Sequence, residues 1–445
     1  MTKTSKLLTL GLSLTVLGGC SALDDLLAVD APSQVVASDL ENPASAGLVV
    51  ASAANEVRCA YAYFAAGSAL TGNEWGDISN NTVLNIWDQR THDTSGYGSQ
   101  YASADCGSTQ PAIYQPQSRA RWISDFALGL LDEWDVSDVP EKAEYQAETG
   151  MYAGFAYLMM GESMCEMAFD TDTNLTTLPD GNGPVVGKDA AFNLAIERFD
   201  AAIAAGATGD ILNAARVGKA RAQLDLGQTA QAATTAGPVP AGFAYELQFS
   251  NQSNETRNPL WNMNVDDENV APAEPYRGFQ YGGVDDPRVT VSDTGRQHPT
   301  TDLEIWVSDK FPDASSPLQM ASYEEARLII AEAEIEAGNL MAAVAIIDAL
   351  HPAGVPAYGA EGEATGPTDG DYDADEVLEH LVLHDRAAEL FLEGQHLYDL
   401  TRHGDIIDLY PAVGVDTGFG GQYSDQICFE LPATEFQNNT TLVGS

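Results

Sequence analysis

Two segments of this 445-residue chain, far apart in the sequence, share one pattern that strongly limits the folds available to it. In residues 189–226, large apolar residues recur at helical spacing, and a Gly-containing turn separates them from a second helix rich in small residues, mainly Ala. Residues 323–350 repeat this arrangement around a turn at Gly338. Helical spacing or composition also predicts helices over 44–69, 118–133, 141–169 and 376–402. Because hairpins that mix small and large residues are typical of tetratricopeptide-like repeats, we predict a mainly α-helical, tetratricopeptide-like helical-repeat scaffold.

One long interruption separates the two hairpins. Residues 236–318 are rich in Pro, Gly, Asn and Asp, and offer only two short strand candidates, 289–291 and 303–307. These runs are too few for a sandwich or a barrel. We interpret the segment as a long irregular loop insertion within a single domain of residues 20–445. The insertion lies between an N-terminal half (20–235) and a C-terminal helical part (319–445).

The chain is strongly acidic. It has 66 acidic residues against 20 basic ones, which gives a formal net charge of −46 and a pI near 4.1. Nucleic-acid binding needs clustered Lys and Arg to neutralise phosphates, so the composition argues against a nucleic-acid partner. It also argues against electrostatic docking on an anionic membrane. A charge of this size and sign is typical of a well-solvated protein surface.

The N-terminus carries an export signal. Two Lys precede an apolar run, Leu7–Leu17, which is too short to span a hydrocarbon core of about 30 Å as a stable helix. The run leads into Leu-Gly-Gly-Cys, which ends at Cys20 and resembles the bacterial lipobox. We predict a lipoprotein signal peptide over residues 1–19 and lipidation of Cys20, which would anchor the chain to a membrane surface. An ordinary secretory signal with an accidental Cys is the alternative.

Export into an oxidising compartment favours disulfides. Four Cys follow Cys20, and they allow three pairings. We favour Cys59–Cys106 and Cys165–Cys428, of which the second would tie the C-terminal tail to a central helix. Four buried free thiols are the alternative. The spacing contains no zinc-type C-x-x-C pair.

Several titratable residues raise metal or catalytic hypotheses. His380 and His384 are spaced i, i+4 and could bind one ion on a helix face, but no H-E-x-x-H motif is present. We interpret these two residues, with His396 and His403, as surface or packing histidines. The charged residues of the last long helix, among them Arg386, Glu389, Glu393 and Arg402, are interpreted as ion pairs between helices rather than as an acid/base pair.

Two acidic runs could hold calcium. Residues 170–174 imitate the start of an EF-hand loop but lack its later Gly and Glu. A second run alternates Asp with other residues before a predicted helix, where solvated carboxylates would also favour the helix N-terminus. We predict no cofactor, with calcium at the second run as the alternative. Its acidic residues are Asp369, Asp371, Asp373 and Asp375.

An ordered series of motifs fills the second half of the chain. It begins with Asp-Pro-Arg at 286–288 and continues with EARLIIAEA at 325–333 and DRAAELFLEGQHLYDLTR at 385–402. It ends with LPATEFQNN at 431–439. Together with the lipobox, this series resembles the SusD/RagB family of outer-membrane nutrient-binding lipoproteins. The chain departs from the family pattern at Asp385, where Glu is usual, and at Gln395-His396, where His-Arg is frequent; both departures concern contacts between helices.

The resemblance implies a function. Members of this family hold ligands in irregular loops on a helical-repeat scaffold, and they are not enzymes. They sit on a SusC-like, TonB-dependent outer-membrane transporter and pass oligosaccharides or peptides into it. We therefore expect a lipid-anchored outer-membrane protein that faces the cell exterior. A glycosidase, which needs two carboxylates about 5–10 Å apart in an aromatic cleft, and a scaffold lipoprotein that binds protein partners are the alternatives.

Candidate ligand residues follow from sugar chemistry and from the family's ligand loops. A pyranose presents an apolar face, which an aromatic ring can cover, and hydroxyls, which amides, carboxylates and Arg can bind. The first loop offers Asn73, Trp75 and Asp77, with Glu74 between them. Trp75 and Trp261 are the preferred stacking residues because of the size of the indole ring. The insertion offers Trp261, Tyr276, Arg277 and Tyr281, with Asn262 beside the Trp.

Overall fold

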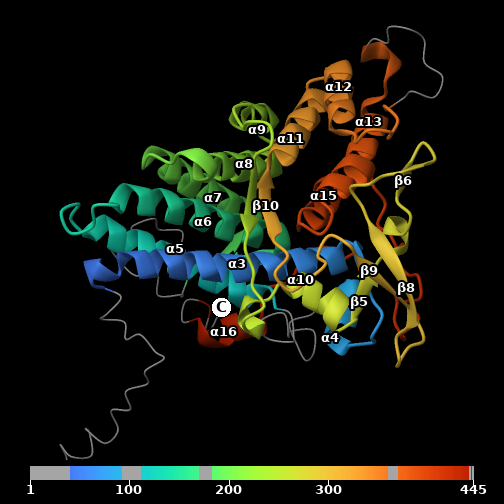
Figure 1. Ribbon diagram of the computed structural model, residues 1–445, viewed down its shortest axis with the longest axis horizontal. Coiled ribbons are helices and arrows are strands. Elements are labelled where there is room, and N and C mark those ends of the chain that lie inside the picture. Colours follow the sequence, from blue (N-terminus) through green and yellow to red (C-terminus); the bar gives the residue numbers. More distant parts are fainter. Residues whose placement is uncertain (1–40, 93–111, 170–182, 359–368, 440–441, 443–445) are drawn as a thin grey trace, which may run out of the picture.

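The computed structural model describes residues 41–92, 112–169, 183–358, 369–439 and 442. The predicted signal peptide, Cys20, Cys106 and the acidic run at 170–174 lie outside these residues. The described chain is mainly helical, so the predicted fold class is confirmed (Figure 1). In the part of the chain that the structure covers, no helix combines the length and the apolar character that a membrane crossing requires.

Helices form a continuous stack that begins on the long helix α3 (Figure 1). Helix α3 packs on α5 and α6, and each later helix packs on its neighbour through α9, which packs on α11 and so joins the two predicted hairpins. The hairpins predicted over 189–226 and 323–350 are both present. The helices of the stack are α3 (Ala46–Thr71), α5 (Tyr114–Glu133), α6 (Lys142–Ser163), α7 (Lys188–Ala204), α8 (Gly209–Asp225), α9 (Thr229–Ala236), α11 (Tyr323–Glu336) and α12 (Leu340–Leu350).

Small residues allow these helices to approach closely. A Cβ added to Gly154 on α6 would lie 2.5 Å from the ring of Phe199, and one added to Gly218 on α8 would lie 2.4 Å from the same ring. Phe199 is fully buried on α7, between these two helices. The large residues of one helix therefore fill the space that the small residues of its neighbours leave, as the repeat pattern predicts.

The insertion is held to the scaffold by short antiparallel strand pairs. Its first strand, β4 (Ala244–Leu247), pairs with β10 (Leu318–Ser322), and β5 (Val270–Pro272) pairs with β1 (Trp75–Asp77) from the first loop. The strand candidate at 303–307 corresponds to β9 (Glu304–Ser308), whereas the candidate at 289–291 overlaps β8 (Val291–Gln297) only at Val291; β8 and β9 pair with each other. Two more pairs are β6 (Gln280–Tyr281) with β7 (Val284–Asp285) and β2 (Glu166–Ala168) with β3 (Val185–Gly187).

Short helical turns complete the described structure. Helix α10 (Pro259–Trp261) continues into a π-helical turn, η4 (Asn262–Asp266), and packs on α3. The other short elements are η1 (Pro43–Ser45), α4 (Thr82–Asp88), η3 (Asn254–Thr256), η5 (Glu274–Tyr276), η6 (Asp369–Asp371) and α16 (Ala433–Asn438).

The single long helix predicted over 376–402 is wrong. The segment forms α13 (Ala374–His380), a π-helical turn η7 (Leu381–Arg386), α14 (Ala387–Glu389) and α15 (His396–Arg402). Leu392 and Gly394, at φ 60° and φ 102°, reverse the chain before α15. A Cβ at Gly394 would lie 2.5 Å from the ring of Phe64 on α3, so the break brings the backbone against the core.

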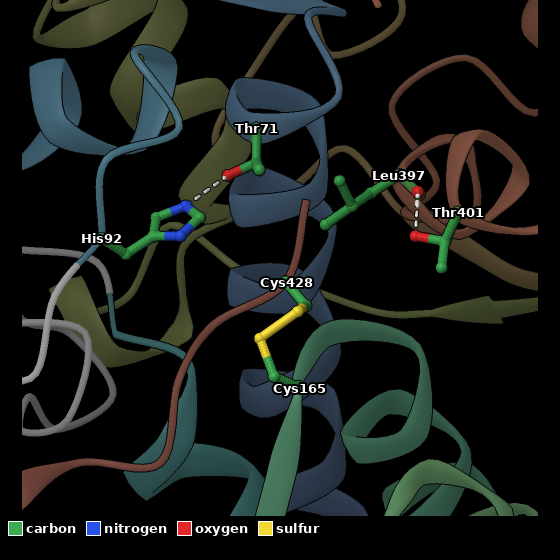
Figure 2. Close-up of a disulfide and its surroundings, with 6 residues drawn as sticks. All are labelled: Thr71, His92, Cys165, Leu397, Thr401 and Cys428. Carbon is green, nitrogen blue, oxygen red and sulfur yellow. Dashed lines mark hydrogen bonds between the residues drawn. A yellow bond between two sulfur atoms is a disulfide. The ribbon is translucent and has the colours of Figure 1, made fainter. Parts of the chain in front are cut away.

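The C-terminal segment returns to α6. Cys165 and Cys428 form the disulfide that we favoured, and it joins this segment to the end of the helix (Figure 2). The backbone N–H of Cys165 donates to the carbonyl of Phe429 at 2.8 Å, and the N–H of Phe429 donates to Ser163 at 2.8 Å. Cys59 is also disulfide-bonded, but its predicted partner lies outside the described residues.

Buried ion pairs join the helices at the centre of the stack. Nε of Arg221 on α8 lies 3.0 Å from Glu162 on α6, and Nη1 lies 3.2 Å from Glu325 on α11. On α15, Arg402 pairs with Glu332 of α11 and lies 3.4 Å from Asp225 of α8. These contacts lock helices to one another, so the structural interpretation of the charged residues is confirmed for Arg402.

The other charged residues of this segment pair in the same way. Arg386 donates to Asp399 at 2.8 Å. Glu393 accepts from Lys310 at 2.7 Å, and Glu389 lies 3.5 Å from Arg288. Glu393 and Glu389 therefore face cations from the insertion, whereas Asp399 pairs within the segment itself.

Candidate functional site

A cavity of ≈ 600 Å³ lies between the insertion and the helical segment α13–η7. One wall comes from the chain between η5 and β6, and the other wall comes from one side of α13 and the start of η7. Aromatic rings and imidazoles line it together with two Glu and one Gln. The lining residues are Pro275, Gly278, Phe279, Gln280, Tyr281, Glu376, Glu379, His380, Leu383 and His384.

The insertion wall is fixed to the core by stacked rings. Tyr276 is buried and stacks on Phe391, with the ring centroids 4.8 Å apart. Phe279 stacks on Tyr276 at 5.8 Å and on His384 at 5.3 Å. Gly278, at φ 75°, turns the chain between these two aromatic residues. The stack therefore places Phe279 at the boundary between core and cavity.

Tyr281 lies at the edge of the same wall, where the hairpin β6–β7 begins. Its ring centroid is 4.7 Å from those of both His380 and His384. The rings are tilted by 52° and 42°, so the tyrosine is not stacked flat on either imidazole. Tyr281 and Phe279 are half-buried, which leaves part of each ring accessible from the cavity.

Behind the cavity wall, three histidines surround one buried carboxylate. Nε2 of His351 lies 2.8 Å from Oδ1 of Asp385, Nε2 of His380 lies 3.1 Å from Oδ2, and Nδ1 of His384 lies 3.6 Å from Oδ1. Asp385 has no exposed side-chain surface. Arg288 approaches the same carboxylate at 3.3 Å.

The histidines set the charge of this carboxylate. Burial raises the pKa of Asp385, but the contacts with His351, His380 and His384 outweigh it and hold the pKa well below its usual range. Burial lowers the pKa of His351, but the hydrogen bond and the charge of Asp385 outweigh it, so that pKa is raised. Asp385 is therefore ionised at neutral pH.

The candidates from the first loop are buried and do not line this cavity. Trp75 has no exposed area, because strand β1 pairs with β5 and carries the indole into the core. Asn73 and Asp77 are buried as well, at 8% and 4% exposure. Asp77 accepts from the hydroxyl and the backbone N–H of Ser79 at 2.8 and 2.9 Å. These residues stabilise the loop, and none of them lines the cavity.

The candidates from the insertion separate into three groups. Tyr281 lines the cavity, whereas Tyr276 is buried beneath it and offers no open ring face. Arg277 points to another surface, where its guanidinium lies 5.4 Å from the ring centroid of Trp306. Trp261 packs against the main core from α10 and is not part of the cavity wall. Trp75 and Trp261, the preferred stacking residues, therefore do not line this cavity.

Sequence reasoning missed most of the other lining residues. Phe279 is one aromatic among several in the insertion, and the pattern does not show which of them faces the cavity. His380 and His384 gave a signal through their i, i+4 spacing, but we interpreted them as packing residues. Glu376 and Glu379 carried no signal, since their role depends on the contact between the insertion and α13.

The acidic run before α13 forms a helix cap. Oδ1 of Asp373 accepts from the backbone N–H groups of Asp375 and Glu376 at 3.0 and 3.2 Å. Among the described residues, the acidic side chains of 369–375 do not gather into a metal-ligand group. The role of Asp373 is therefore that of the N-cap residue of α13.

Comparison with known proteins agrees with this architecture. Residues 323–439 match the model of the SusD family. Comparison with curated proteins finds no match. A SusD superfamily protein from Bacteroides vulgatus ATCC 8482 superposes with a TM-score of 0.64 and 15% identity, over 89% of this chain and 97% of that one.

Two further structures extend the likeness. A SusD superfamily protein from Parabacteroides distasonis ATCC 8503 has a TM-score of 0.64 and 15% identity, and covers 92% of this chain and 98% of its own. A SusD-like carbohydrate binding protein from Bacteroides vulgatus ATCC 8482 has a TM-score of 0.56 and 16% identity, with 81% and 83% covered. Residues 323–439 therefore match the SusD family, and the fold of SusD superfamily proteins is shared along most of the chain.

Proposed function

We propose that this protein is a cell-surface lipoprotein that binds oligosaccharides in the cavity between the insertion and α13–η7. The observation that carries the proposal is the composition of this cavity. Half-buried aromatic rings and an amide on the insertion wall stand opposite carboxylates of α13 around a volume of ≈ 600 Å³. That volume is in the range of small-molecule binding sites. One solved structure with the same fold is described as a carbohydrate binding protein, which supports this choice of ligand class.

The cavity supplies both kinds of contact that a sugar needs. The accessible parts of Phe279 and Tyr281 would cover the apolar face of a pyranose. Gln280, Glu376 and Glu379 are exposed, and their oxygens and amide group would bind hydroxyls at the rim. Because the aromatic wall is anchored to the core through Tyr276, it needs little ordering when a ligand binds.

A second aromatic surface lies on the adjacent hairpin β8–β9. Arg277 covers Trp306, whose Nε1 donates to Glu304 at 3.1 Å. Tyr410, from the segment after α15, is 49% exposed, and its hydroxyl donates to Glu274 at 3.1 Å. We assign this surface a secondary role, as a place where a longer chain could continue beyond the cavity.

The rest of the proposal concerns delivery. Lipidation of Cys20 would hold the protein at the outer membrane, on the cell exterior, and the ligand would pass to a TonB-dependent, SusC-like transporter. We propose no catalytic step, since an aromatic cavity with a fixed wall suits capture and release. Peptides remain the second ligand class within the same role.

The test is a glycan and peptide array probed with residues 21–445, followed by calorimetry on the best ligand. Tyr281→Ala should lower the affinity by about 1–3 kcal/mol, as expected for the loss of an aromatic hot spot, with unchanged melting temperature. Trp122→Ala is the matched control, because this 38% exposed ring lies on α5, away from the cavity wall. Equal affinity of the two variants for a verified ligand would contradict the proposed site. Release of sugars from a bound polysaccharide would contradict the non-catalytic role.

A further inference from the structure

We propose that His351, His380, His384 and Asp385 form a binding site for one divalent transition-metal ion of the Zn²⁺ type. Each residue offers one ligand atom, and the four atoms all lie within 4.8 Å of one another. The site comes from the described residues alone and does not depend on oligosaccharide binding. It would join the residue after α12 to the end of α13 and to η7.

The polar atoms at this place lack the hydrogen bonds that buried groups normally have. Within the described part of the chain, Nε2 of His380, both ring nitrogens of His384 and Oδ2 of Asp385 are buried without a hydrogen-bond partner. The 3.1 Å approach of His380 to Asp385 is an ion-pair distance without hydrogen-bond geometry. Buried, unpaired polar atoms are costly, and a cation that accepts their lone pairs would remove this cost.

His351 is oriented as a metal ligand is. Its Nδ1 lies 2.7 Å from the backbone carbonyl of Pro356. A carbonyl oxygen can only accept, so Nδ1 carries a hydrogen. Nε2 lies 2.8 Å from Oδ1 of Asp385, to which it donates a second hydrogen when no ion is bound; a bound ion would take the place of this hydrogen. Metal-ligating histidines typically donate their second N–H to a carbonyl or carboxylate in this way.

The π-helical turn η7 brings the other three ligands together. His380 ends α13, and His384 and Asp385 lie within η7. In a regular α-helix, a residue five positions on is rotated by about 140° from the first, which would carry Asp385 away from His380. The wider turn places them 3.1 Å apart and stacks the two imidazoles, with ring centroids separated by 5.0 Å. π-Helical turns of this kind are frequent at functional sites.

The spacing and the charge suit a small divalent ion. In a tetrahedral site with bonds of about 2.0–2.1 Å, neighbouring ligand atoms lie roughly 3.3 Å apart, so the 4.8 Å cluster needs only modest side-chain movement. Arg288 contacts Oδ1 of Asp385, which leaves Oδ2 for the ion. The side chain of Asp286 lies 3.5 Å from Nε2 of His384 and would orient that ring.

The donor set selects the class of metal. Three imidazole nitrogens and one carboxylate are typical of zinc and other first-row transition metals. Calcium and magnesium prefer oxygen ligands and would find only one carboxylate here. His380 and His384 also line the cavity, so the ion would lie directly behind its wall.

Calorimetry with Zn²⁺ tests the proposal, on the chain purified without a polyhistidine tag. The wild type should bind one Zn²⁺ per chain, and Co²⁺ should give the intense visible absorption of a tetrahedral site. His351→Ala should weaken Zn²⁺ binding by more than the roughly 10–100-fold that changes around a metal site typically cost. His298→Ala is the matched control, since His298 is also buried but lies on the hairpin β8–β9.

Each outcome decides the proposal. Loss of binding in His351→Ala with retention in His298→Ala supports it. No Zn²⁺ uptake by the wild type, or equal uptake by both variants, overturns it. If His351→Ala does not fold, the Co²⁺ spectrum of the wild type decides: an octahedral, weakly absorbing spectrum would contradict the His₃Asp set. Because no sugar is present, failure here leaves the oligosaccharide proposal to its own test.

Discussion

Two groups of buried ionisable residues differ in the kinds of side chain that surround each charge. At the centre of the helical stack, Arg221 and Arg402 face carboxylates from three different helices, so positive and negative groups alternate. Beside the cavity, three imidazoles converge on one carboxylate, and several of their nitrogens have no hydrogen-bond partner among the described residues. Both groups contain buried atoms without a hydrogen-bond partner among the described residues, Nε of Arg221 and of Arg402 included. The first group sets guanidinium cations against carboxylates, whereas the second directs three metal-ligating imidazoles at one carboxylate. Burial of charge alone therefore does not indicate a functional site; the kind of atoms that converge does.

The largest expected effect is the loss of stability when an arginine is removed from the central ion pairs. Arg402→Met should destabilise the protein by about 3–5 kcal/mol, because Glu332 and Asp225 would remain buried without their cation. Arg296→Met is the matched control, since its ion pair with Glu268 is 58% exposed on the arginine side and should contribute less than about 1 kcal/mol. Urea unfolding of both variants measures the difference. Similar losses in the two variants would contradict the structural role assigned to the central ion pairs.

A second experiment adds Zn²⁺ to the histidine cluster beside the cavity. Zn²⁺ at about 100 times its dissociation constant should stabilise the wild type by about 2.7 kcal/mol, and a chelator should reverse this. The same addition should leave the stability of His351→Ala unchanged, because the ligand set is then incomplete. Thermal unfolding with and without Zn²⁺ provides the measurement. A Zn²⁺-dependent shift of equal size in the variant would show that the ion binds elsewhere.

Glu74 is a buried carboxylate that has no arginine partner in the part of the chain that the structure describes. Its Oε1 accepts from the backbone N–H of Leu392 at 2.7 Å, and burial, which outweighs this bond, raises the pKa of Glu74 to about 8. The unfolded chain loses this proton near pH 4.5 and the folded chain near pH 8, so the contribution of Glu74 to stability is lost as the pH rises between these values.

Glu74→Gln should therefore gain stability over the wild type by about 1–3 kcal/mol as the pH passes through this range. The amide keeps the acceptor for Leu392 and removes the titration. Urea unfolding at both ends of the range measures the gain, with the exposed Glu133→Gln as control. A constant difference between variant and wild type across the range would refute the assignment.

The smallest expected effect concerns the surface beside the cavity. Trp306→Ala should weaken binding of a long oligosaccharide by less than about 1 kcal/mol, and should not affect a monosaccharide or disaccharide. This follows from the position of Trp306 under Arg277, outside the cavity. Calorimetry with a series of chain lengths tests it. If Trp306→Ala lowered the affinity more than Tyr281→Ala does, the surface around Trp306 would be the main binding site and the cavity the secondary one.

The helical scaffold could be predicted because its signals are local. The helix predicted to begin at Tyr323 does so, where Ser322 accepts from the backbone N–H of Glu325 at 3.0 Å. The break within 376–402 could not be predicted, since it depends on the contact of Gly394 with Phe64, a residue more than three hundred positions away. Periodicity shows which residues along a helix are apolar, but it does not show which distant segment of the chain packs against that helix.

The candidate site was harder to predict for a related reason. Trp75 and Tyr281 both stand in polar, aromatic-rich loops, yet pairing of β1 with β5 buries the first, and the position of the second at the edge of β6 leaves it beside the cavity. The i, i+4 spacing of His380 and His384 was visible in the sequence. Their partner His351 was not, because α12 and the residues after it reach this place only through the fold.

The central claim is that the ligand cavity lies between the insertion and α13–η7. The most direct test is a crystal structure with the best oligosaccharide from the array. The account predicts a sugar ring against Phe279 and Tyr281, with hydroxyls bound by Glu376 or Glu379. A sugar held instead on Trp306 and Tyr410, with nothing bound between these walls, would contradict it.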